Sequence, residues 1–221
     1  MKNTLTIDSV ILEYGRRRIL QDIYLSCETG KIIGLLGRNG TGKTSLLKTI
    51  FGEVFPSSKS VRINEKALLG SYRSYKDIKY LPQSNFIPKS LTLKRVFEDF
   101  DLDFQSLVND FSIFQSLYDI KIKHLSGGER RIIEIYLILV SETKFCLLDE
   151  PFSQIMPVHV DTIKKIISRE KENKGIILTD HLYQHVLSLS DKIHVINNGK
   201  TNIAKDIHDL EHLGYVPKLT K

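Results

Sequence analysis

The chain has 221 residues, of which 41% are apolar and 26% charged, so it can bury a substantial core and is not expected to be disordered. Two cysteines, Cys27 and Cys146, are too few for a disulfide framework, the amino terminus lacks a signal-peptide pattern, and no apolar run reaches the roughly 18 residues of a spanning helix. The 32 basic against 26 acidic side chains give a net charge of +6, and all of this surplus lies within residues 1–83.

Hydrophobic periodicity predicts the secondary structure along the chain. Residues 4–12 and 19–27 alternate apolar and polar side chains, which predicts half-buried strands of an antiparallel layer. Short apolar runs predict buried strands at 31–36, 78–81, 145–148, 175–178 and 193–196. Helical patterns cover 43–51, 128–141, 158–170 and 181–189, and residues 197–200 read as a hairpin turn before a final strand. This alternation predicts an α/β sheet with helices on its faces.

Residues 84–124 differ in composition from the rest of the chain. Strand-like runs disappear, acidic residues slightly outnumber basic ones, and six of the ten phenylalanines fall here. They are Phe86, Phe97, Phe100, Phe104, Phe111 and Phe114. We interpret the segment as a small helical insertion whose aromatic side chains mostly form its own core, with one or two exposed for a partner.

The strongest motif runs from Gly37 to Thr44 and reads GRNGTGKT, a full match to G-x-x-x-x-G-K-[ST]. It follows a buried strand and opens a helix, so its glycines let backbone N–H groups converge on phosphate oxygens. Lys43 can then reach the β- and γ-phosphates, and the Thr44 hydroxyl can bind Mg²⁺. A glycine-rich turn that precedes Lys-Thr by chance is the competing explanation. The candidate nucleotide-binding residues are Asn39, Gly40, Thr41, Gly42, Lys43, Thr44 and Ser45.

A second motif, FCLLDE, occupies residues 145–150 and ends a buried strand with two carboxylates. The carboxyl ends of strands are where α/β sheets place their sites. Asp149 is placed to bind Mg²⁺ through its water shell, and Glu150 can polarise an attacking water. Strands often end in acidic residues, so the pattern indicates a functional site only in combination with the phosphate loop.

A third motif, LSGGE at residues 125–129, places a glycine pair at the start of a helix. By itself it indicates either another anion-binding helix terminus or a simple cap. The pentapeptide resembles the signature of ATP-binding-cassette (ABC) proteins, and it lies between the other two motifs as it does in that family. The resemblance implies that Ser126, Gly127 and Gly128 contact the ATP held by an opposite subunit, so that the working unit is a dimer enclosing two nucleotides.

Further residues match the family pattern one by one. Tyr14 matches the aromatic residue that stacks on adenine, although an ordinary strand aromatic is the competing interpretation. Gln83, in YLPQ, matches the glutamine that contacts Mg²⁺ and water and links the core to the helical insertion. His181, in TDH, matches the histidine that contacts the γ-phosphate. The resemblance therefore implies Glu150, His181 and Gln83 as catalytic residues, with ATP and Mg²⁺ as cofactors.

The resemblance also implies an organisation for the whole chain. We expect one ABC ATPase domain of the α/β class, a P-loop NTPase core with an antiparallel β layer and a small helical subdomain. The core is expected to comprise 1–83 and 125–204, the helical subdomain 84–124, and a C-terminal tail 205–221. LSGGERR, DEPF and TDH together resemble the lipopolysaccharide-export and branched-chain amino-acid branch of the family.

Two features depart from the family pattern. Met156 stands where an aspartate usually follows the catalytic glutamate, which puts the coupling between the two nucleotide sites in doubt. The helix after the signature has Ile132 and Leu137 in place of arginines and Tyr136 in place of a small residue. Its unusually apolar face indicates either a more buried helix or an altered contact with the helical insertion or a partner.

We therefore expect an ATP-hydrolysing subunit that powers a membrane transporter as a nucleotide-sandwich homodimer. It would work with a separate transmembrane permease subunit and lie in the cytoplasm, held on the inner face of the cell membrane by that subunit. The alternative is a soluble ATP-dependent switch or scaffold with weak hydrolysis, which Met156 motivates. A DNA-handling ATPase is disfavoured because no heptad run is present, and one set of motifs excludes a two-cassette translation factor.

The location of the basic surplus argues against a nucleic-acid partner. It falls on the third of the chain that holds Tyr14 and the phosphate loop, so a polyphosphate ligand accounts for part of it. A face turned toward an anionic leaflet is the remaining interpretation for the other basic residues.

Overall fold

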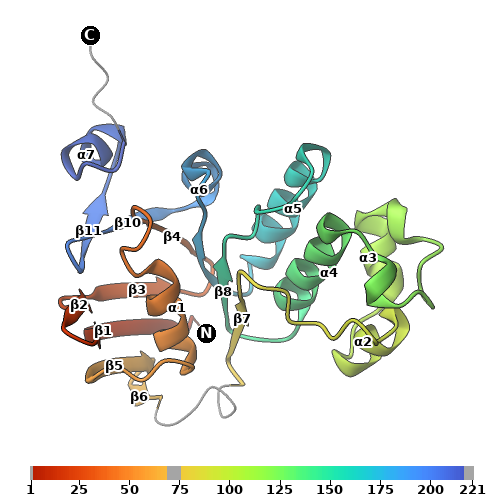
Figure 1. The fold of residues 1–221 in the computed structure, drawn as a ribbon, viewed down its shortest axis with the longest axis horizontal. Helices are drawn as coiled ribbons and strands as arrows, with labels where there is room; N and C mark the ends of the chain where they lie inside the picture. The colour runs from red at the N-terminus through yellow and green to blue at the C-terminus, as the bar shows by residue number, and fades with distance from the viewer. Residues whose placement is uncertain (1, 69–75, 217–221) are drawn as a thin grey trace.

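The computed structural model describes residues 2–68 and 76–216, in which two sheets form the framework and helices pack against them (Figure 1). The strands are β1 Thr4–Tyr14, β2 Arg17–Leu20, β3 Tyr24–Glu28, β4 Ile32–Leu36, β5 Ser58–Ile63, β6 Lys66–Ala67, β7 Ile78–Leu81, β8 Phe145–Asp149, β9 Gly175–Thr179, β10 Lys192–Asn197 and β11 Lys200–Ala204. The helices are α1 Lys43–Phe51, α2 Leu93–Asp99, α3 Phe104–Asp110, α4 Gly127–Val140, α5 Pro157–Glu170, α6 Tyr183–Leu189 and α7 Ile207–His212, with short 3₁₀ turns η2 Ser112–Phe114 and η3 Ile122–His124. The predicted α/β class is confirmed.

The first sheet is antiparallel and has the strand order β2-β1-β5-β6, with β3 also paired to β1. The antiparallel layer expected at the start of the chain is therefore confirmed. The single strand expected over 19–27 is wrong, because the segment pairs with two separate parts of β1. Leu20 lies opposite Leu12, whereas Tyr24 lies opposite Asp8, so the chain must cross between the two registers at residues 21–23.

The second sheet has the order β11-β10-β4-β9-β8-β7. Its strands from β10 to β7 run parallel, and β11 returns antiparallel to β10 through the expected hairpin, in which Asn197 pairs with Lys200. Asn198 and Gly199 have φ values of 50° and 75°, the left-handed conformation that a tight two-residue hairpin requires. Buried on both faces, the parallel strands read as continuous apolar runs, which is why the sequence revealed them.

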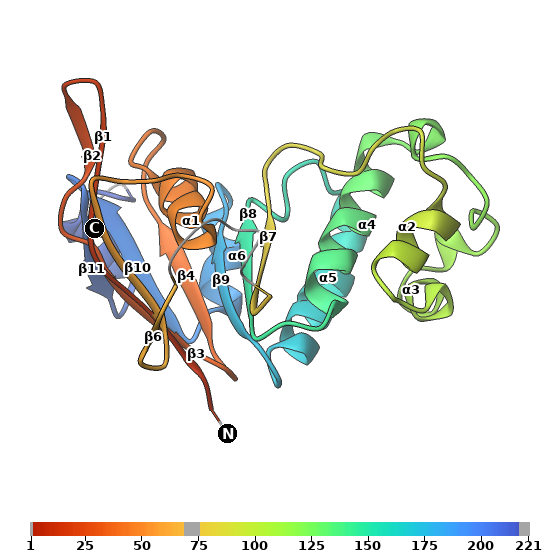
Figure 2. The same cartoon turned by 90° about the horizontal axis from the view of Figure 1, so that it is seen from below.

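Two hydrophobic cores lie on opposite faces of the parallel sheet. One fills the space between the two sheets and includes Leu46, Leu47 and Ile50 of α1, which Figure 2 shows between them. The other packs α4, α5 and α6 on the opposite face. In α4 both Ile132 and Tyr136 are buried, so the interpretation of a more buried helix is confirmed.

Residues 84–124 contain α2, α3 and the two 3₁₀ turns, and α4 lies between these helices and the sheet (Figure 2). The expected exposure of one or two of the six phenylalanines is wrong, since each is buried or half-buried. Their core is also not separate: the ring of Phe97 lies 5.1 Å from that of Phe104 and 6.2 Å from that of Tyr136 in α4. Tyr136 therefore fills the junction between the segment and the core.

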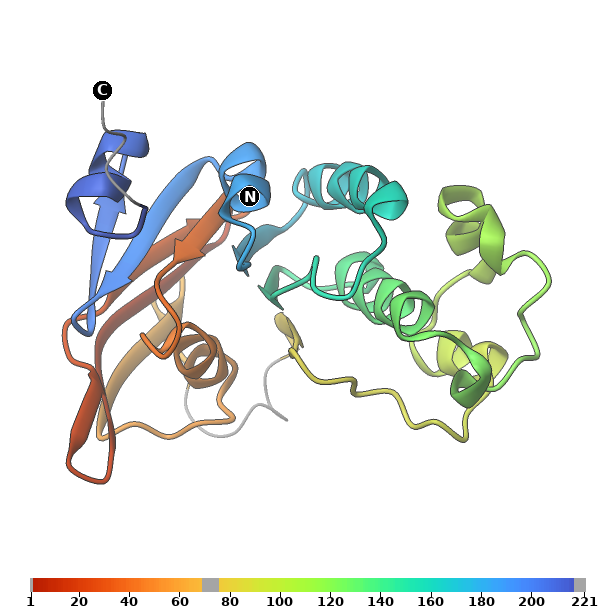
Figure 3. The same cartoon turned by 45° about the horizontal axis from the view of Figure 1, so that its top comes forward.

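The end of the described chain forms α7 beside β11 and β10 (Figure 3). Leu210 of α7 is fully buried, and the Asn197 side-chain amide donates a hydrogen bond to the carbonyl of Leu213. The segment expected as a tail is thus packed on the second sheet as far as residue 216. Within the described part of the chain, no helix combines the length and apolar character needed to cross a membrane.

His194 of β10 yields a prediction about acid stability. Its side chain is 1% exposed, neither ring nitrogen has a hydrogen-bond partner, and burial together with the charge of Lys192 lowers its pKa from 6.5 to about 4. The unfolded chain therefore takes up a proton as the pH falls below 6.5, whereas the folded chain does not until about pH 4. Between pH 7 and 4.5 the unfolding free energy should fall by roughly 2–3 kcal/mol through this group.

Urea unfolding of wild type and His194→Leu at both pH values checks this. The variant should lose less stability on acidification, while His212→Leu, which removes an exposed histidine, should behave as wild type. An equal pH dependence in all three proteins would contradict the assignment to His194.

Candidate functional site

The predicted motifs meet at one edge of the parallel sheet because they follow the carboxyl ends of neighbouring strands. The phosphate loop follows β4, Gln83 follows β7, and His181 follows β9, while β8 ends in Asp149 with Glu150 next. These strands are adjacent in the order β4-β9-β8-β7, so their ends lie side by side. The parallel sheet thereby collects residues that are distant in the sequence, from the phosphate loop to His181, whereas Tyr14 comes from the end of β1 in the other sheet.

An open cavity of about 420 Å³ lies at this edge. It is lined by Tyr14, Ile19, Asn39, Gly40, Gly42, Lys43, Thr44, Ser45, Gln83, Glu150 and His181. The cavity thus brings together most of the predicted site residues. Tyr14 stands at its rim with 53% of its surface exposed, so the ring face is available for stacking rather than packed in the sheet.

The phosphate loop depends on glycine where it enters α1. Gly42 has a φ of 101°, and a Cβ atom there would lie 2.7 Å from the Ile19 side chain, so any other residue would be both strained and crowded. The Lys43 ammonium donates to the carbonyl oxygens of Gly37 at 2.7 Å and Arg38 at 3.3 Å. Burial lowers the pKa of Lys43, although the nearby carboxylates of Glu150 and Asp149 oppose that shift. The Lys43 side chain therefore lies against the phosphate loop, with its ammonium group bound to two loop carbonyls.

The Asp149 carboxylate is fully buried beneath the cavity. Its Oδ1 accepts hydrogen bonds from the Thr44 hydroxyl and the Gln83 amide, both at 3.2 Å, and its Oδ2 accepts one from the Tyr80 hydroxyl at 3.1 Å. Burial nevertheless raises the pKa of Asp149, because these neutral donors only partly replace the water that the carboxylate lost.

Glu150 faces the cavity and is contacted by two other predicted residues. Its Oε1 atom accepts a hydrogen bond from Gln83 Nε2 at 2.8 Å and lies 2.7 Å from His181 Nε2. Burial raises the pKa of Glu150, with His181 acting in the opposite direction. The side chains of Gln83, Glu150 and His181 thus converge on one carboxylate oxygen.

The donor set fits a divalent cation beside bound phosphates. The Thr44 hydroxyl and the Asp149 carboxylate are hard oxygen ligands, and the raised pKa of Asp149 shows a buried negative charge that its neighbours do not fully neutralise. Mg²⁺ typically binds one or two carboxylates and completes its shell with phosphate oxygens and water. Thr44 and Asp149 are therefore the residues that would hold such an ion, with Gln83 next to both.

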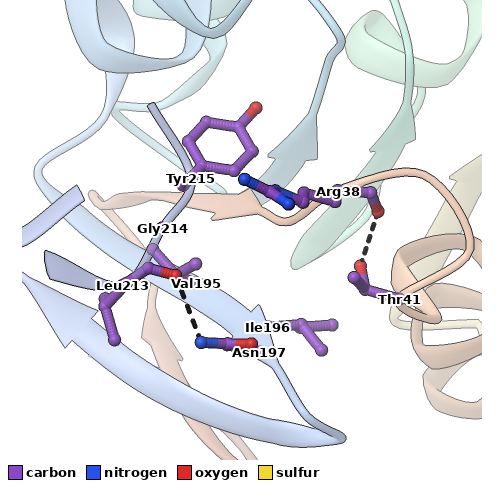
Figure 4. Close-up of a pocket in the computed structure, with 8 residues that line it drawn as sticks. All are labelled: Arg38, Thr41, Val195, Ile196, Asn197, Leu213, Gly214 and Tyr215. Carbon is purple, nitrogen blue, oxygen red and sulfur yellow. Dashed lines mark hydrogen bonds between the residues drawn. The ribbon is translucent and has the colours of Figure 1, made fainter. Parts of the chain in front are cut away.

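Thr41 lies away from this cavity. Its hydroxyl donates to the Arg38 carbonyl at 2.8 Å, and its side chain lines a smaller pocket of about 170 Å³ on another side of the loop, bounded by β10 and the segment after α7 (Figure 4). Tyr215 extends from that segment over Arg38 in the same pocket (Figure 4). The Thr41 side chain therefore faces the smaller pocket and not the cavity beside the phosphate loop.

The LSGGE motif also lies apart from the first cavity. Ser126 caps α4 by accepting from the Glu129 amide at 3.2 Å, and the Glu129 carboxylate accepts from the Ser126 amide at 2.7 Å. Ser126 and Gly128 line another cavity of about 410 Å³ together with Met156, which is 61% exposed. Among residues 2–68 and 76–216, none lines both cavities. Within one chain, the motif and the phosphate loop do not form a common site.

Two site residues were missed in the sequence. Tyr80 opens the YLPQ segment in which only Gln83 was given a role, and only its alternation with Lys79 in β7 indicates that it points inward. Arg131 follows the LSGGE motif, where charged residues usually indicate an exposed helix face, yet it is 2% exposed and donates to the carbonyls of Asp149 and Glu150. Helical spacing could not reveal contacts with strands that are distant in sequence.

A phosphate-binding loop on a parallel sheet, with a buried aspartate at the end of a nearby strand, defines a P-loop NTPase. The model of the family described as "ABC transporter" matches residues 20–153, more than half of the chain, so the chain belongs to that family. It is an ABC ATPase homologous to the ATP-binding subunits of transporters, and the predicted family and fold are confirmed.

Similar proteins span nearly the whole chain. The lipopolysaccharide export system ATP-binding protein LptB of Escherichia coli strain K12 is 32% identical, covering 93% of this chain and 94% of the relative. The high-affinity branched-chain amino acid transport ATP-binding protein BraG of Pseudomonas aeruginosa is 28% identical over 89% of this chain and 90% of its own. A solved ATP-binding subunit of an ABC transporter superposes with a TM-score of 0.83 at 21% identity, covering 96% and 93% of the two chains. The resemblance to the lipopolysaccharide-export and branched-chain amino-acid branch is thereby confirmed.

The hydrogen bond from Tyr80 to Asp149 yields a second prediction. Tyr80→Phe removes a donor from a buried, charged carboxylate and should lower the unfolding free energy at pH 7 by about 1.5–3 kcal/mol. Chemical denaturation measures the loss, and Tyr118→Phe, at a more exposed tyrosine, is the matched control. Equal stability of the two variants would show that the hydroxyl does not support Asp149.

Proposed function

We propose that the chain binds MgATP in the cavity beside the phosphate loop and hydrolyses it with Glu150, His181 and Gln83. The observation that carries this proposal is the convergence of Gln83 and His181 on Oε1 of Glu150, in the cavity that the phosphate loop lines. The phosphate loop is thus available to hold the phosphates, and Gln83, Glu150 and His181 are available to act on the terminal phosphate. When bound, Mg²⁺ neutralises charge on the β- and γ-phosphate oxygens.

The loop residues bind the nucleotide in this proposal. The backbone N–H groups of residues 39–45 and the N-terminus of α1 bind phosphate oxygens, and Tyr14 stacks on the adenine from the rim. Lys43 lines the same cavity, and its ammonium group donates to the Gly37 carbonyl. In this proposal the ammonium group leaves that carbonyl and binds the β- and γ-phosphates when the nucleotide is bound. Thr44 and Asp149 hold the metal ion.

Glu150 orients and polarises the attacking water. Its raised pKa makes the carboxylate a stronger base than that of an exposed glutamate, which favours proton abstraction. His181 and Gln83 hold the carboxylate in place, and both line the cavity in which the γ-phosphate would lie in this proposal. Roles for each residue thus follow from contacts within a single cavity.

We further propose that two copies of the chain enclose the nucleotides. Ser126, Gly127 and Gly128 form a capped helix N-terminus, a favourable site for phosphate oxygens, but Ser126 and Gly128 line a cavity separate from that of the phosphate loop. They can therefore serve a nucleotide only on another subunit. A homodimer places this terminus of each copy against the phosphate loop of the other.

In its transport role, the chain would supply energy to a separate transmembrane permease subunit. Residues 1–83 and 125–204 form the nucleotide-binding core in this proposal, and 84–124 form the helical subdomain that docks the partner. Gln83, directly before that segment, carries nucleotide-dependent movement to it. This arrangement would hold the chain in the cytoplasm against the inner face of the membrane. Homology over nearly the whole chain to ATP-binding proteins of an export system and of an amino acid transport system supports a transport role over a soluble switch.

Lys43→Ala tests the phosphate-loop assignment. Removing a partly buried cation that can bond the β- and γ-phosphates should weaken ATP binding by about 10- to 100-fold, measured with a fluorescent nucleotide. Lys48→Ala, also in α1 but paired with Glu53, is the control and should leave affinity unchanged. Unaltered binding by Lys43→Ala would remove this lysine from the site.

Glu150→Gln tests the catalytic assignment and separates an ATPase from a switch. The amide keeps the size and hydrogen-bonding shape of the side chain but cannot accept the proton, so turnover should fall by about 100-fold or more while ATP affinity changes little. The variant should also accumulate an ATP-bound dimer in size-exclusion chromatography.

Glu142→Gln, at an exposed position, is the control for the loss of one charge. Hydrolysis by Glu150→Gln at the wild-type rate would exclude Glu150 as the catalytic base. Wild-type protein that binds ATP and dimerises but turns over no faster than Glu150→Gln would instead favour the switch with weak hydrolysis.

A further inference from the structure

Two opposite charges, those of Arg131 and Glu134, are buried within α4 outside the catalytic cavity. Arg131 is 2% exposed and Glu134 is fully buried, and Arg131 Nη1 lies 3.8 Å from Glu134 Oε2. Charged side chains are almost never buried this deeply without a specific set of partners. The partners of this pair therefore indicate what it does.

The Arg131 guanidinium joins the ends of two strands of the catalytic sheet. Its Nη1 donates to the Pro82 carbonyl at 2.7 Å, directly before Gln83. Its Nη2 donates to the carbonyls of Asp149 at 2.9 Å and Glu150 at 3.0 Å. One planar group thus fixes the backbone on which both Gln83 and Glu150 are carried.

The backbone of Glu150 requires such support. Its φ is 52°, in the left-handed region that a residue with a Cβ atom adopts only at a cost. The two carbonyls that Arg131 binds lie on either side of this residue, so the guanidinium restrains both of its backbone torsions. These torsions set the direction in which the Glu150 side chain leaves the backbone.

Glu134 attaches the same helix to the segment that leads into α2. Its Oε1 accepts hydrogen bonds from the Phe86 amide at 3.0 Å and the Ile87 amide at 3.4 Å, and from Arg130 Nε at 3.3 Å. Arg131 and Glu134 therefore link α4 both to the catalytic strand ends and to the start of residues 84–124.

The pair is not arranged for maximal stability. Arg131 Nε and Glu134 Oε2 are buried without a hydrogen-bond partner. Burial also disfavours both charges, lowering the pKa of Arg131 and raising that of Glu134. A buried ion pair with unpaired atoms contributes little net stability compared with apolar residues, so its contacts with the site are the better explanation.

We propose that Arg131 is a positioning residue for ATP hydrolysis, which holds the backbone at Asp149 and Glu150 against Pro82 so that the Glu150 side chain stays directed into the cavity. The proposal rests on the proposed function of Glu150. Through Glu134, the same helix is also attached to the segment that enters α2.

The test separates positioning from charge balance. Arg131→Met leaves Glu134 with less compensation and should lower the melting temperature, whereas adding Glu134→Gln removes the uncompensated charge and should restore most of it. The double variant should still turn over about 10- to 100-fold more slowly, with KM for ATP nearly unchanged, because a small misplacement of Glu150 lowers kcat rather than binding.

Two further variants sharpen the comparison. Arg130→Met is the matched control, since Arg130 bonds Glu134 and the Ile87 carbonyl but neither Asp149 nor Glu150, and its kcat should stay close to wild type. Arg131→Lys keeps the charge beside Glu134, but a single ammonium cannot reproduce the planar, two-nitrogen contact with three carbonyls. The kcat of Arg131→Lys should therefore fall by about tenfold at unchanged KM. This single variant tests the proposal on its own if the double variant, Arg131→Met with Glu134→Gln, fails to fold.

Recovery of kcat together with the melting temperature in the double variant would overturn the proposal, as would wild-type kcat in Arg131→Lys. Glu150→Gln is measured alongside to separate two kinds of failure. If Glu150→Gln stalls but the Arg131 variants turn over normally, only the positioning role is wrong. If Glu150→Gln hydrolyses ATP at the wild-type rate, the proposed function fails and the positioning role fails with it.

Discussion

The Asp149 carboxylate lies fully buried at the end of β8 and accepts hydrogen bonds from Thr44, Tyr80 and Gln83. These donors come from α1, from β7 and from the loop after β7, so one buried charge determines how three segments meet. A buried carboxylate without donors is costly, which strongly favours arrangements that bring these three together. The position of the phosphate loop relative to Gln83 depends on this interaction. The site around it is therefore organised by polar contacts under the cavity as well as by the apolar cores.

Helix α4 joins several parts of this organisation. Its N-cap is Ser126 in a capping box, its middle carries Arg131 and Glu134, and the buried Tyr136 packs against the ring of Phe97 in α2. The residues of this helix from Arg130 to Leu139 are all buried, so its apolar side chains belong to the core. The apolar face noted in the sequence is therefore the face of a buried helix, and Tyr136 extends it to the ring of Phe97.

Local patterns predicted most elements because each carries its own signal. The strand–loop–helix from 31 to 51 has an apolar run, a glycine-rich turn and helical spacing, and the structure has β4 and α1 there. Two predictions were wrong where tertiary pairing decides. The segment 19–27 breaks into β2 and β3 because β1 pairs with it in two registers. The phenylalanines of residues 84–124 are covered by one another and by neighbouring helices, as Phe97 is by Tyr136 of α4 and Phe111 by His159 of α5. The roles of the site residues stay proposals until the variants are measured.

The sequence by itself predicted the family and the candidate residues for the chemistry, because GRNGTGKT, LSGGE and the acidic pair 149–150 are contiguous and are recognisable from local sequence alone. Only the tertiary structure decided which of them share a cavity. It showed Gln83 and His181 on the same oxygen of Glu150, the LSGGE motif in a separate cavity, and Arg131 on the backbone of Glu150. Such contacts depend on strand order and on the packing of α4, and residues that are distant along the chain leave no periodic signal of their contact.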